Sequence, residues 1–454
     1  MQSAKKLISA ISLLFLYTTI SAAPPYPQST YITNITWDWT SHKREAPGSD
    51  NWVITWADNG HQYTSWGDGG GFGGTNSDGR VSLGIGRVEG TFDSYTGYNV
   101  WGGKNPETAA LWDGKTYGLI SISGILYCWV SPGSDNNGYV SQKLQWSSDH
   151  GRTWTRAGWQ FVQSSGVIAP AILNFGQDNA GARDNYIYTY VIRLKDASVL
   201  KVQKPGQIEL FRAPKTSYTD SSTYEYFAGL SGGSPVWSGN ISSRVPVFED
   251  ANGVGWNLSV VYNAGLDRYI LVTEHDASFS SRFGFFEAEE PWGPWKTIAY
   301  YDNLGSGSGI TDNDKGFYGN FSNKWTSADG RNAVFVYTGV SAADSWNAVR
   351  AVFTVQVSDA TPRGMFKALA GKHDGINTYP NPFNPNVSIS IAKCGSQIIN
   401  VRIYTIFGHM VADLTQSIRN GMAVWNAAGL PSGTYLVRAA SQSGIMVKPV
   451  TLMK

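Results

Sequence analysis

The chain has 454 residues, a net charge of +1, 15% charged residues, 13% aromatic residues and 51 glycines. The near-neutral charge offers no basic stripe, which argues against nucleic acid as a partner. The length predicts two or three domains, and the excess of aromatic residues and glycine without long helix-periodic runs predicts an all-β protein.

The N-terminus has the pattern of a secretory signal peptide. Lys5 and Lys6 precede an apolar run at 7–20, which ends in the small residues 21–23. The run is short for a membrane span and no stop-transfer pattern follows it. We therefore expect a signal peptide over 1–23 and an exported mature chain.

Residues 50–69, DNWVITWADNGHQYTSWGDG, predict a hairpin. Two aromatic-rich apolar runs flank Asp58-Asn59-Gly60, and Asn-Gly between such runs is a strong hairpin signal. Asp50 lies just before the first strand and Asp68 just after the second. The hairpin therefore brings two carboxylates toward one mouth.

The register of this hairpin decides how close the two acids come. A three-residue loop pairs positions that sum to 118, so that Asp50 lies opposite Asp68 and Trp52 opposite Trp66. A two-residue loop, Asn59-Gly60, would instead place Asp68 opposite Asn51 and point the acids to opposite faces. The sequence leaves both open, and the aromatic pair favours the first.

The region from 24 to 358 predicts a β-propeller. Short strands alternate with Gly, Asn, Asp and Ser turns, and residues 147–154, SSDHGRTW, match the Asp-box pattern S-x-D-x-G-x-T-W, which is typical of propellers. The box is expected to tie off a turn, not to catalyse. At roughly 50–65 residues per blade, the length favours five blades, with six as the alternative.

The remaining chain predicts a linker over 359–377 and a small Ig-like β-sandwich over 378–454. The only cysteines, Cys128 and Cys394, fall in different domains, so we expect no disulfide between them. Cys128 lies in an apolar strand and is expected to be a small buried residue.

The C-terminal module resembles a known family. Residues 379–385 (YPNPFNP), 403–404 (IY), 407–408 (FG) and 430–435 (LPSGTY) resemble the C-terminal sorting domain of type IX secretion substrates. The resemblance implies an outer-membrane bacterium, export through the type IX secretion machinery, and release or anchoring at the cell surface. A generic Ig-like carbohydrate-binding module is the alternative.

Asp50 and Asp68 are the candidate catalytic residues. A propeller brings its inner strands to one central channel, and glycosidic cleavage needs one carboxylic acid to protonate the leaving oxygen and a second carboxylate as nucleophile or base. The spacing alone also allows Asp68 to cap a turn and Asp50 to begin a strand. Glu107, Glu249 and Glu274 are reserve acids. No His, Asp, Glu or Cys cluster has metal-ligand spacing, so neither a metal nor another cofactor is predicted.

The propeller region also resembles a family. Residues 50–69 together with 174–176 (NFG), 180–184 (AGARD), 262–266 (YNAGL) and 290–295 (EPWGPW) are similar to secreted five-bladed propellers related to bacterial endo-D-arabinanases. The resemblance implies hydrolysis within a furanosyl polysaccharide, with Asp50 and Asp68 as the essential pair.

Further residues are expected to bind the polysaccharide substrate. They are Asn51, Trp52, Trp66, Arg183, Asp184, Tyr262 and Asn263. The tryptophans could equally be core residues, Arg183 and Asp184 could form a structural ion pair, and Asn263 could begin a turn.

Two other classes of function compete with the hydrolase. A polysaccharide lyase would need a His or Tyr base and a group that neutralises a uronate, and a non-catalytic glycan-binding propeller would not need the acids. A sialidase has thin support, because there is a single Asp box and no evident arginine triad. We expect a monomer.

Overall fold

The computed structural model describes residues 22–133, 141–196, 201–310, 315–339, 344–356, 376–391, 398–405, 410–419, 421–441 and 444–454. Apart from their final positions, the predicted signal peptide (1–23) and linker (359–377) lie outside these residues, as does Cys394. Within these ranges no helix has the length and apolar character needed to cross a membrane. Helical structure there is limited to 3-10 turns, at Phe92–Ser94, Gln163–Ser165, Gln177–Asn179, Lys215–Ser217, Ser221–Thr223, Ile241–Ser243 and Thr415–Ser417.

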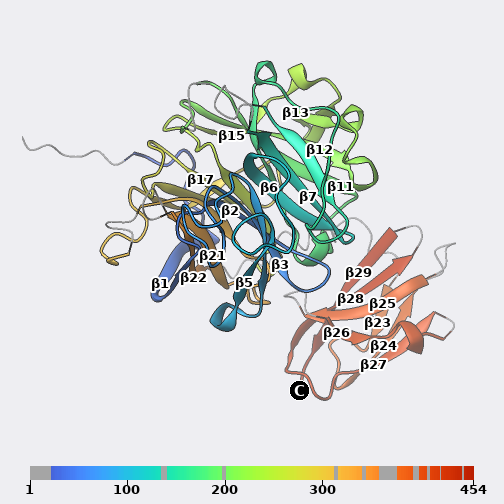
Figure 1. Ribbon diagram of the computed structural model, residues 1–454. Helices are drawn as coiled ribbons and strands as arrows, with labels where there is room; N and C mark the ends of the chain where they lie inside the picture. Colours follow the sequence, from blue (N-terminus) through green and yellow to red (C-terminus); the bar gives the residue numbers. More distant parts are fainter. Residues whose placement is uncertain are drawn as a thin grey trace, which may run out of the picture.

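Five antiparallel sheets follow one another and form the blades of a propeller (Figure 1). The first two blades are β2 (Asp50–Trp56), β3 (Gln62–Gly67), β4 (Gly84–Glu89), β5 (Thr96–Trp101), and β6 (Gly114–Ile122), β7 (Ile125–Pro132), β8 (Lys143–Ser147), β9 (Thr155–Arg156). The third has six strands, β10 (Val167–Ile172), β11 (Tyr186–Arg193), β12 (Gly206–Pro214), β13 (Glu225–Ser231), β14 (Ser234–Ser238) and β15 (Pro246–Asp250). The fourth is β16 (Leu258–Asn263), β17 (Arg268–Glu274), β18 (Phe283–Ala288) and β19 (Lys296–Tyr301). The predicted number of five blades is thus confirmed.

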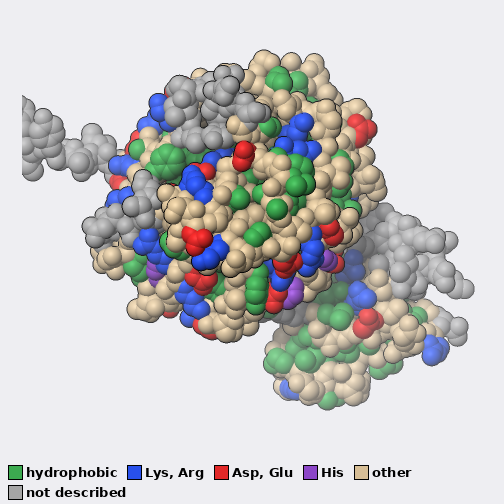
Figure 2. All heavy atoms as spheres, in the orientation of Figure 1, with side chains coloured by type: hydrophobic (Ala, Val, Ile, Leu, Met, Phe, Trp, Pro, Cys, Tyr) green, Lys and Arg blue, Asp and Glu red, His purple; other side chains and the backbone are tan. Residues whose placement is uncertain are grey.

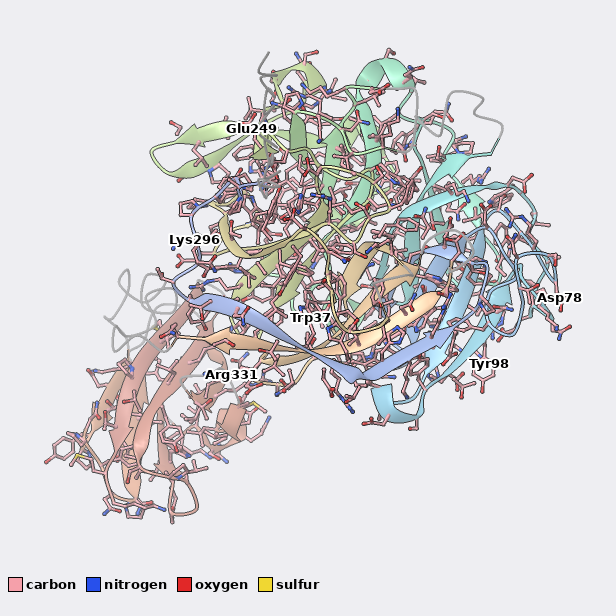
Figure 3. The ribbon with its side chains drawn as sticks, turned by 90° about the vertical axis from the view of Figure 1, so that its left-hand side faces the viewer. Trp37, Asp78, Tyr98, Glu249, Lys296 and Arg331 are labelled. Carbon is pink, nitrogen blue, oxygen red and sulfur yellow. The ribbon has the colours of Figure 1, made fainter. Side chains whose placement is uncertain are left out.

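The fifth blade combines both ends of the propeller sequence. It consists of β20 (Gly316–Phe321), β21 (Asn332–Gly339), β22 (Trp346–Val355) and the N-terminal β1 (Ile32–Glu45). β1 runs antiparallel to β22, with Trp37 opposite Ala351 (Figure 3). The Trp37 ring packs on Phe335 of the same blade at 5.4 Å and on Phe285 of the fourth blade at 5.5 Å between centroids. The ring of blades is therefore closed by strand pairing and by aromatic packing between neighbours.

Apolar side chains fill the spaces between blades, as the composition predicts, and inner strands such as β6, β10 and β20 are buried along their whole length. Cys128 on β7 is fully buried, as expected, and burial raises the pKa of its thiol. On the visible face, Lys and Arg are interspersed with Asp and Glu, in keeping with the net charge of +1 (Figure 2).

The Asp-box segment forms the turn between β8 and β9. Ser147 Oγ accepts the Gly151 N–H at 2.8 Å, and the Asp149 carboxylate accepts the Thr153 N–H at 2.9 Å and its hydroxyl at 2.6 Å. Trp154 is 8% exposed and donates its indole N–H to the Gly151 carbonyl. These contacts fold the turn onto itself and anchor it in the core.

The C-terminal residues form a separate two-sheet sandwich (Figure 1). One sheet contains β23 (Ile376–Tyr379), β24 (Asn386–Ile391) and β27 (Met422–Asn426); the other contains β26 (Met410–Asp413), β25 (Ile398–Thr405), β28 (Gly433–Ser441) and β29 (Gly444–Leu452). Val387, Ile389, Val401, Trp425 and Val437 pack in its core. The predicted all-β architecture, a propeller followed by a small sandwich, is confirmed.

Candidate active site

The inner strands of the blades run in the same direction around the propeller. Near their starts, the Asn51 side-chain amide on β2 donates to the Thr116 carbonyl on β6 at 3.1 Å; near their ends, Thr55 Oγ1 accepts the Ser121 N–H at 3.1 Å. β3 runs antiparallel to β2, so its last residues return to the start of β2. Asp50 and Asp68 consequently lie at one end of the propeller, which we call the Asp50 end.

A bulge interrupts the hairpin directly beside Asp50. From Val53↔Ser65 to Trp56↔Gln62 the paired positions sum to 118, as the first register predicts, but Asp50 pairs with Gly67 instead of Asp68. The predicted Asp50–Asp68 pair is therefore wrong by one residue. The extra residue is absorbed around Asn51, whose φ is +63°, and Asp68 has a φ of +54°. Such bulges re-aim side chains and are common beside active sites.

Buried contacts hold this strained segment in place. Asn51 is fully buried, and its Oδ1 accepts the side-chain amide of Asn257 at 2.7 Å from the fourth blade. Trp52 and Trp66 are also fully buried, and their rings lie 5.4 Å apart, which confirms the predicted aromatic pair. All three side chains are buried in the hairpin that carries the acids, and they offer no exposed face to a ligand in this structure.

A lysine from the neighbouring blade lies between the two acids. Lys115 on β6 is 5% exposed, and its Nζ lies 2.9 Å from Asp68 Oδ1 and 3.8 Å from Asp50 Oδ1. Arg80 also contacts Asp68 Oδ1, at 3.2 Å. Because both carboxylates contact one nitrogen atom, their contacting oxygens can be no farther apart than the sum of the two lysine distances.

The two carboxyl groups have different surroundings. Asp68 pairs with two cations and its side chain is 33% exposed, whereas the Asp50 side chain is 18% exposed and its Oδ1 has no hydrogen-bond partner among the described residues. Burial raises the pKa of Asp50 to about 7; the Lys115 charge opposes this rise, and the Asp68 and Asp344 charges add to it. One group can thus carry a proton near neutral pH while the other is an ion-paired carboxylate.

Gly67 makes this arrangement sterically possible. A Cβ at this position would lie 2.7 Å from Lys115 Cδ and 2.8 Å from Asp50 Oδ1. A larger residue would push the lysine and the acid apart. Lys115 and Arg80 were not predicted from the sequence; the signal for Lys115 was a single charged residue near the start of the fully buried strand Gly114–Ile122.

Four of the expected substrate-binding residues lie elsewhere. Tyr262 and Asn263 form the last residues of inner strand β16, and Arg183 donates to the Tyr269 hydroxyl at the start of β17. Asp184 accepts the Tyr188 hydroxyl at 2.7 Å near the start of β11. These positions are at the end of the propeller opposite to Asp50, so the structure does not bring them to the two acids.

Of the three reserve acids, only Glu274 lies at the Asp50 end. Glu107 pairs with Arg87 and Arg152, and Glu249 on β15 accepts the Gln207 amide; both sets of contacts are away from the inner strands. Glu274 ends β17, whose pairing with β16 places it at the Asp50 end. No group of three or more His, Cys, Asp or Glu side chains arranged to hold a metal ion occurs within the residues that the structure describes.

Comparison with known proteins identifies the C-terminal module. Residues 377–452 match the family model of the secretion system C-terminal sorting domain. The small sandwich is a sorting domain. This match confirms the predicted domain and shows that the protein is secreted or attached to the cell surface, with the secretion machinery as the partner of the sorting domain.

The sorting domain leads to a direct prediction. We expect a chain that ends at residue 356 to fold its propeller but to remain inside the cell envelope, because the signal for passage across the outer membrane is gone. Immunoblots of medium, intact-cell surface and envelope fractions would measure this. Recovery of the truncated chain in the medium at the level of the full-length protein would contradict the assignment.

No curated protein sequence matches the chain. Similar solved structures include exo-β-1,3-galactanase from Phanerochaete chrysosporium, at 11% identity, covering 90% of each chain with a TM-score of 0.41. A family 117 glycoside hydrolase from Zobellia galactanivorans shares 10% identity over 71% of this chain and 88% of its own, with a TM-score of 0.37. A GH62 hydrolase bound to xylotriose shares 10% identity over 73% and 97%, also with a TM-score of 0.37.

Proposed function

We propose that the propeller is a glycoside hydrolase that uses Asp50 and Asp68 to cleave within a furanoside-rich, D-arabinan-like polysaccharide. The observation that carries this proposal is the pair of unlike carboxyl groups that share Lys115 at the Asp50 end. The furanoside class and the endo-type cleavage follow from the resemblance of residues 50–69 and the later motifs to endo-D-arabinanase-related propellers.

In this proposal Asp50 is the general acid. Its carboxyl proton passes to the glycosidic oxygen as the bond to the anomeric carbon breaks, while Asp68 attacks that carbon from the other side. Lys115 and Arg80 pair with the Asp68 carboxylate before it reacts. Once Asp68 is esterified, its negative charge is gone and it no longer raises the pKa of Asp50, which favours Asp50 as the base that activates water in the second step.

The shared lysine is compatible with a retaining mechanism, which we include in the proposal. Retaining enzymes hold their carboxyl groups about 5–5.5 Å apart and inverting enzymes about 6.5–9.5 Å. Both groups contact Lys115 Nζ, at 2.9 and 3.8 Å, so their contacting oxygens are close enough to allow the retaining geometry. We expect the first product to keep the anomeric configuration of the substrate, which proton NMR early in the reaction would measure. An inverted first product would assign Asp68 the role of a base that activates water.

The pKa of Asp50 predicts how activity depends on pH. An acid with a pKa near 7 is protonated below that pH, so kcat/KM should fall about tenfold per pH unit above about 7. Initial rates across pH 5–10, with stability checked separately, would measure this alkaline limb. A profile that stays flat up to pH 9 would remove Asp50 as the acid.

The function itself is tested by incubating the purified protein with a panel of arabinans, galactans, xylans and uronate-containing polysaccharides. New reducing ends with a rapid fall in chain length would support endo-hydrolysis. Unsaturated products that absorb in the ultraviolet would indicate a lyase instead. Binding without any cleavage would indicate a glycan-binding propeller, and would leave the two aspartates without a catalytic role.

A further inference from the structure

Three aromatic side chains gather at the Asp50 end on the fourth and fifth blades. Trp256 and Phe317 are stacked with centroids 6.1 Å apart, and Phe279 meets Phe317 edge-on at 4.8 Å and Trp256 at 6.0 Å. Trp256 and Phe317 are 4% and 2% exposed, whereas Phe279 is 36% exposed. Phe279 therefore presents an aromatic surface to solvent that rests on two buried rings.

This group of rings is connected through buried contacts to the strands that carry Asp50 and Lys115. Trp256 precedes Asn257, whose amide holds Asn51 next to Asp50 at 2.7 Å. The Trp256 ring also meets Tyr117 edge-on at 6.0 Å, and Tyr117 lies on β6 two positions after Lys115. The Tyr318 hydroxyl, next to Phe317, donates to the Tyr117 carbonyl at 2.5 Å. The rings thus lie at the same end of the propeller as the acids, near the starts of inner strands.

The backbone that carries Phe279 is strained. Asp276, Phe279 and Ser281 have φ values of +66°, +58° and +59°, a region that bulky residues rarely adopt. Ser281 fixes the end of this loop, because its N–H donates to the Gly316 carbonyl at 2.9 Å and its Oγ accepts the Gly316 N–H at 2.7 Å. Strained residues of this kind persist where the surrounding structure imposes them, often at ligand sites.

Glu274 holds Phe279 in this conformation. The Glu274 carboxyl is fully buried, and its Oε1 accepts the Phe279 N–H at 3.0 Å; its Oε2 has no hydrogen-bond partner among the described residues. Burial raises the pKa of Glu274 to about 8. A buried carboxyl whose side-chain hydrogen bond, among the described residues, is to the N–H of an exposed phenylalanine can hold that ring in place.

We infer that Phe279 stacks on a sugar ring next to the cleaved linkage and that Glu274 is its positioning residue. The inference rests on the proposed function, since Phe279 lies at the Asp50 end and packs on Trp256, which contacts Tyr117 on the strand that carries Lys115. Sugar rings present apolar C–H faces that pack on aromatic rings, and a few aromatic contacts beside the reacting groups fix the orientation of a bound chain. In this inference a furanoside chain bound at the acid pair extends along the Asp50 end as far as Phe279.

The test compares Phe279→Ala with Phe279→Trp and with Tyr98→Ala as the matched control. Tyr98 is a 42% exposed aromatic residue on β5 in the first blade (Figure 3). We expect Phe279→Ala to raise KM for oligosaccharides about tenfold with kcat within about twofold, Phe279→Trp to restore KM, and Tyr98→Ala to match the wild type. Glu274→Ala should raise KM in the same way, and Glu274→Gln, which keeps an acceptor for the Phe279 N–H, should not.

The outcomes separate this inference from the proposed function. If the wild type cleaves a polysaccharide and Phe279→Ala has the same KM as the wild type, the stacking role is overturned, but the proposed hydrolase activity is supported. If the wild type binds a polysaccharide in affinity electrophoresis but does not cleave it, the proposed hydrolase activity is overturned. In that case, weaker binding by Phe279→Ala than by Tyr98→Ala still supports the stacking role of Phe279. If the wild type binds no glycan in the panel, the stacking role is overturned as well.

Discussion

We expect Asp50→Asn and Asp68→Asn each to lower kcat by about 10³-fold with the fold intact, because general acid catalysis alone contributes about 10²–10⁴-fold. An amide in place of the Asp50 carboxyl has no acidic proton to give to the leaving oxygen, and an amide in place of the Asp68 carboxylate is neither a nucleophile nor a base. Rates of new reducing ends on the best polysaccharide of the panel would measure the loss. Asp78→Asn, which removes an exposed acid paired with Lys104 at 2.6 Å, is the matched control and should keep full activity.

The roles of the two acids can be separated with an activated substrate. An aryl furanoside with a good leaving group needs no proton, so Asp50→Asn should recover most of its activity on it, whereas Asp68→Asn should not. Stability gives an independent check. The folded-state pKa of Asp50 is raised, so its contribution to stability is present below the unfolded value near 3.8 and is lost as pH rises through about 7. Above pH 7, Asp50→Asn should therefore melt no lower than the wild type. Full activity of both Asp→Asn variants would remove the site assignment.

Lys115→Met should have the second largest effect. It removes the cation that contacts both carboxylates, so Asp68 keeps only Arg80 and the rise in the pKa of Asp50 is no longer opposed by the lysine. We expect kcat to fall about 100-fold, in line with a lost electrostatic contact at a reacting group, and the alkaline limb of kcat/KM to move to higher pH. The pH–rate profile of the variant beside the wild type would measure both.

A lysine at the surface provides the control for this prediction. Lys104→Met removes the cation that pairs with exposed Asp78 and should leave kcat and the pH profile unchanged. Lys115→Arg keeps the charge and should retain more activity than Lys115→Met. An alkaline limb that does not move in Lys115→Met would mean that the lysine does not tune Asp50.

The sequence predicted the parts of the fold that depend on local patterns. The Asn-Gly turn and the aromatic pair Trp52–Trp66 set the hairpin register, and the Asp box and the strand spacing indicated the propeller. The bulge at Asn51 was not predicted, because it depends on partners from two other blades, Thr116 and Asn257. No pattern within 50–69 records those contacts.

Strand direction explains why some residues that were expected to bind substrate do not lie at the site. Tyr262 and Asn263 end an inner strand, whereas Asp50 begins one, and parallel inner strands place starts and ends at opposite faces. Lys115 is near the start of inner strand β6, so the same rule places it at the Asp50 end, beside the acids. Ranking polar residues by whether they begin or end an inner strand would have selected Lys115 and rejected Asn263 from the sequence alone.

The pairing of β1 with β22 has a consequence for how the protein is made. The first strand of the propeller finds its partner only after all intervening blades have been synthesised, so the ring cannot close while the ribosome is still translating the fifth blade. Until then, β1 and the growing sheet both carry unsatisfied backbone edges that could pair with other chains. The pairing of β1 therefore waits longer than that of any other described strand in the propeller, and the unfinished ring is open to edge-to-edge pairing until the fifth blade is complete.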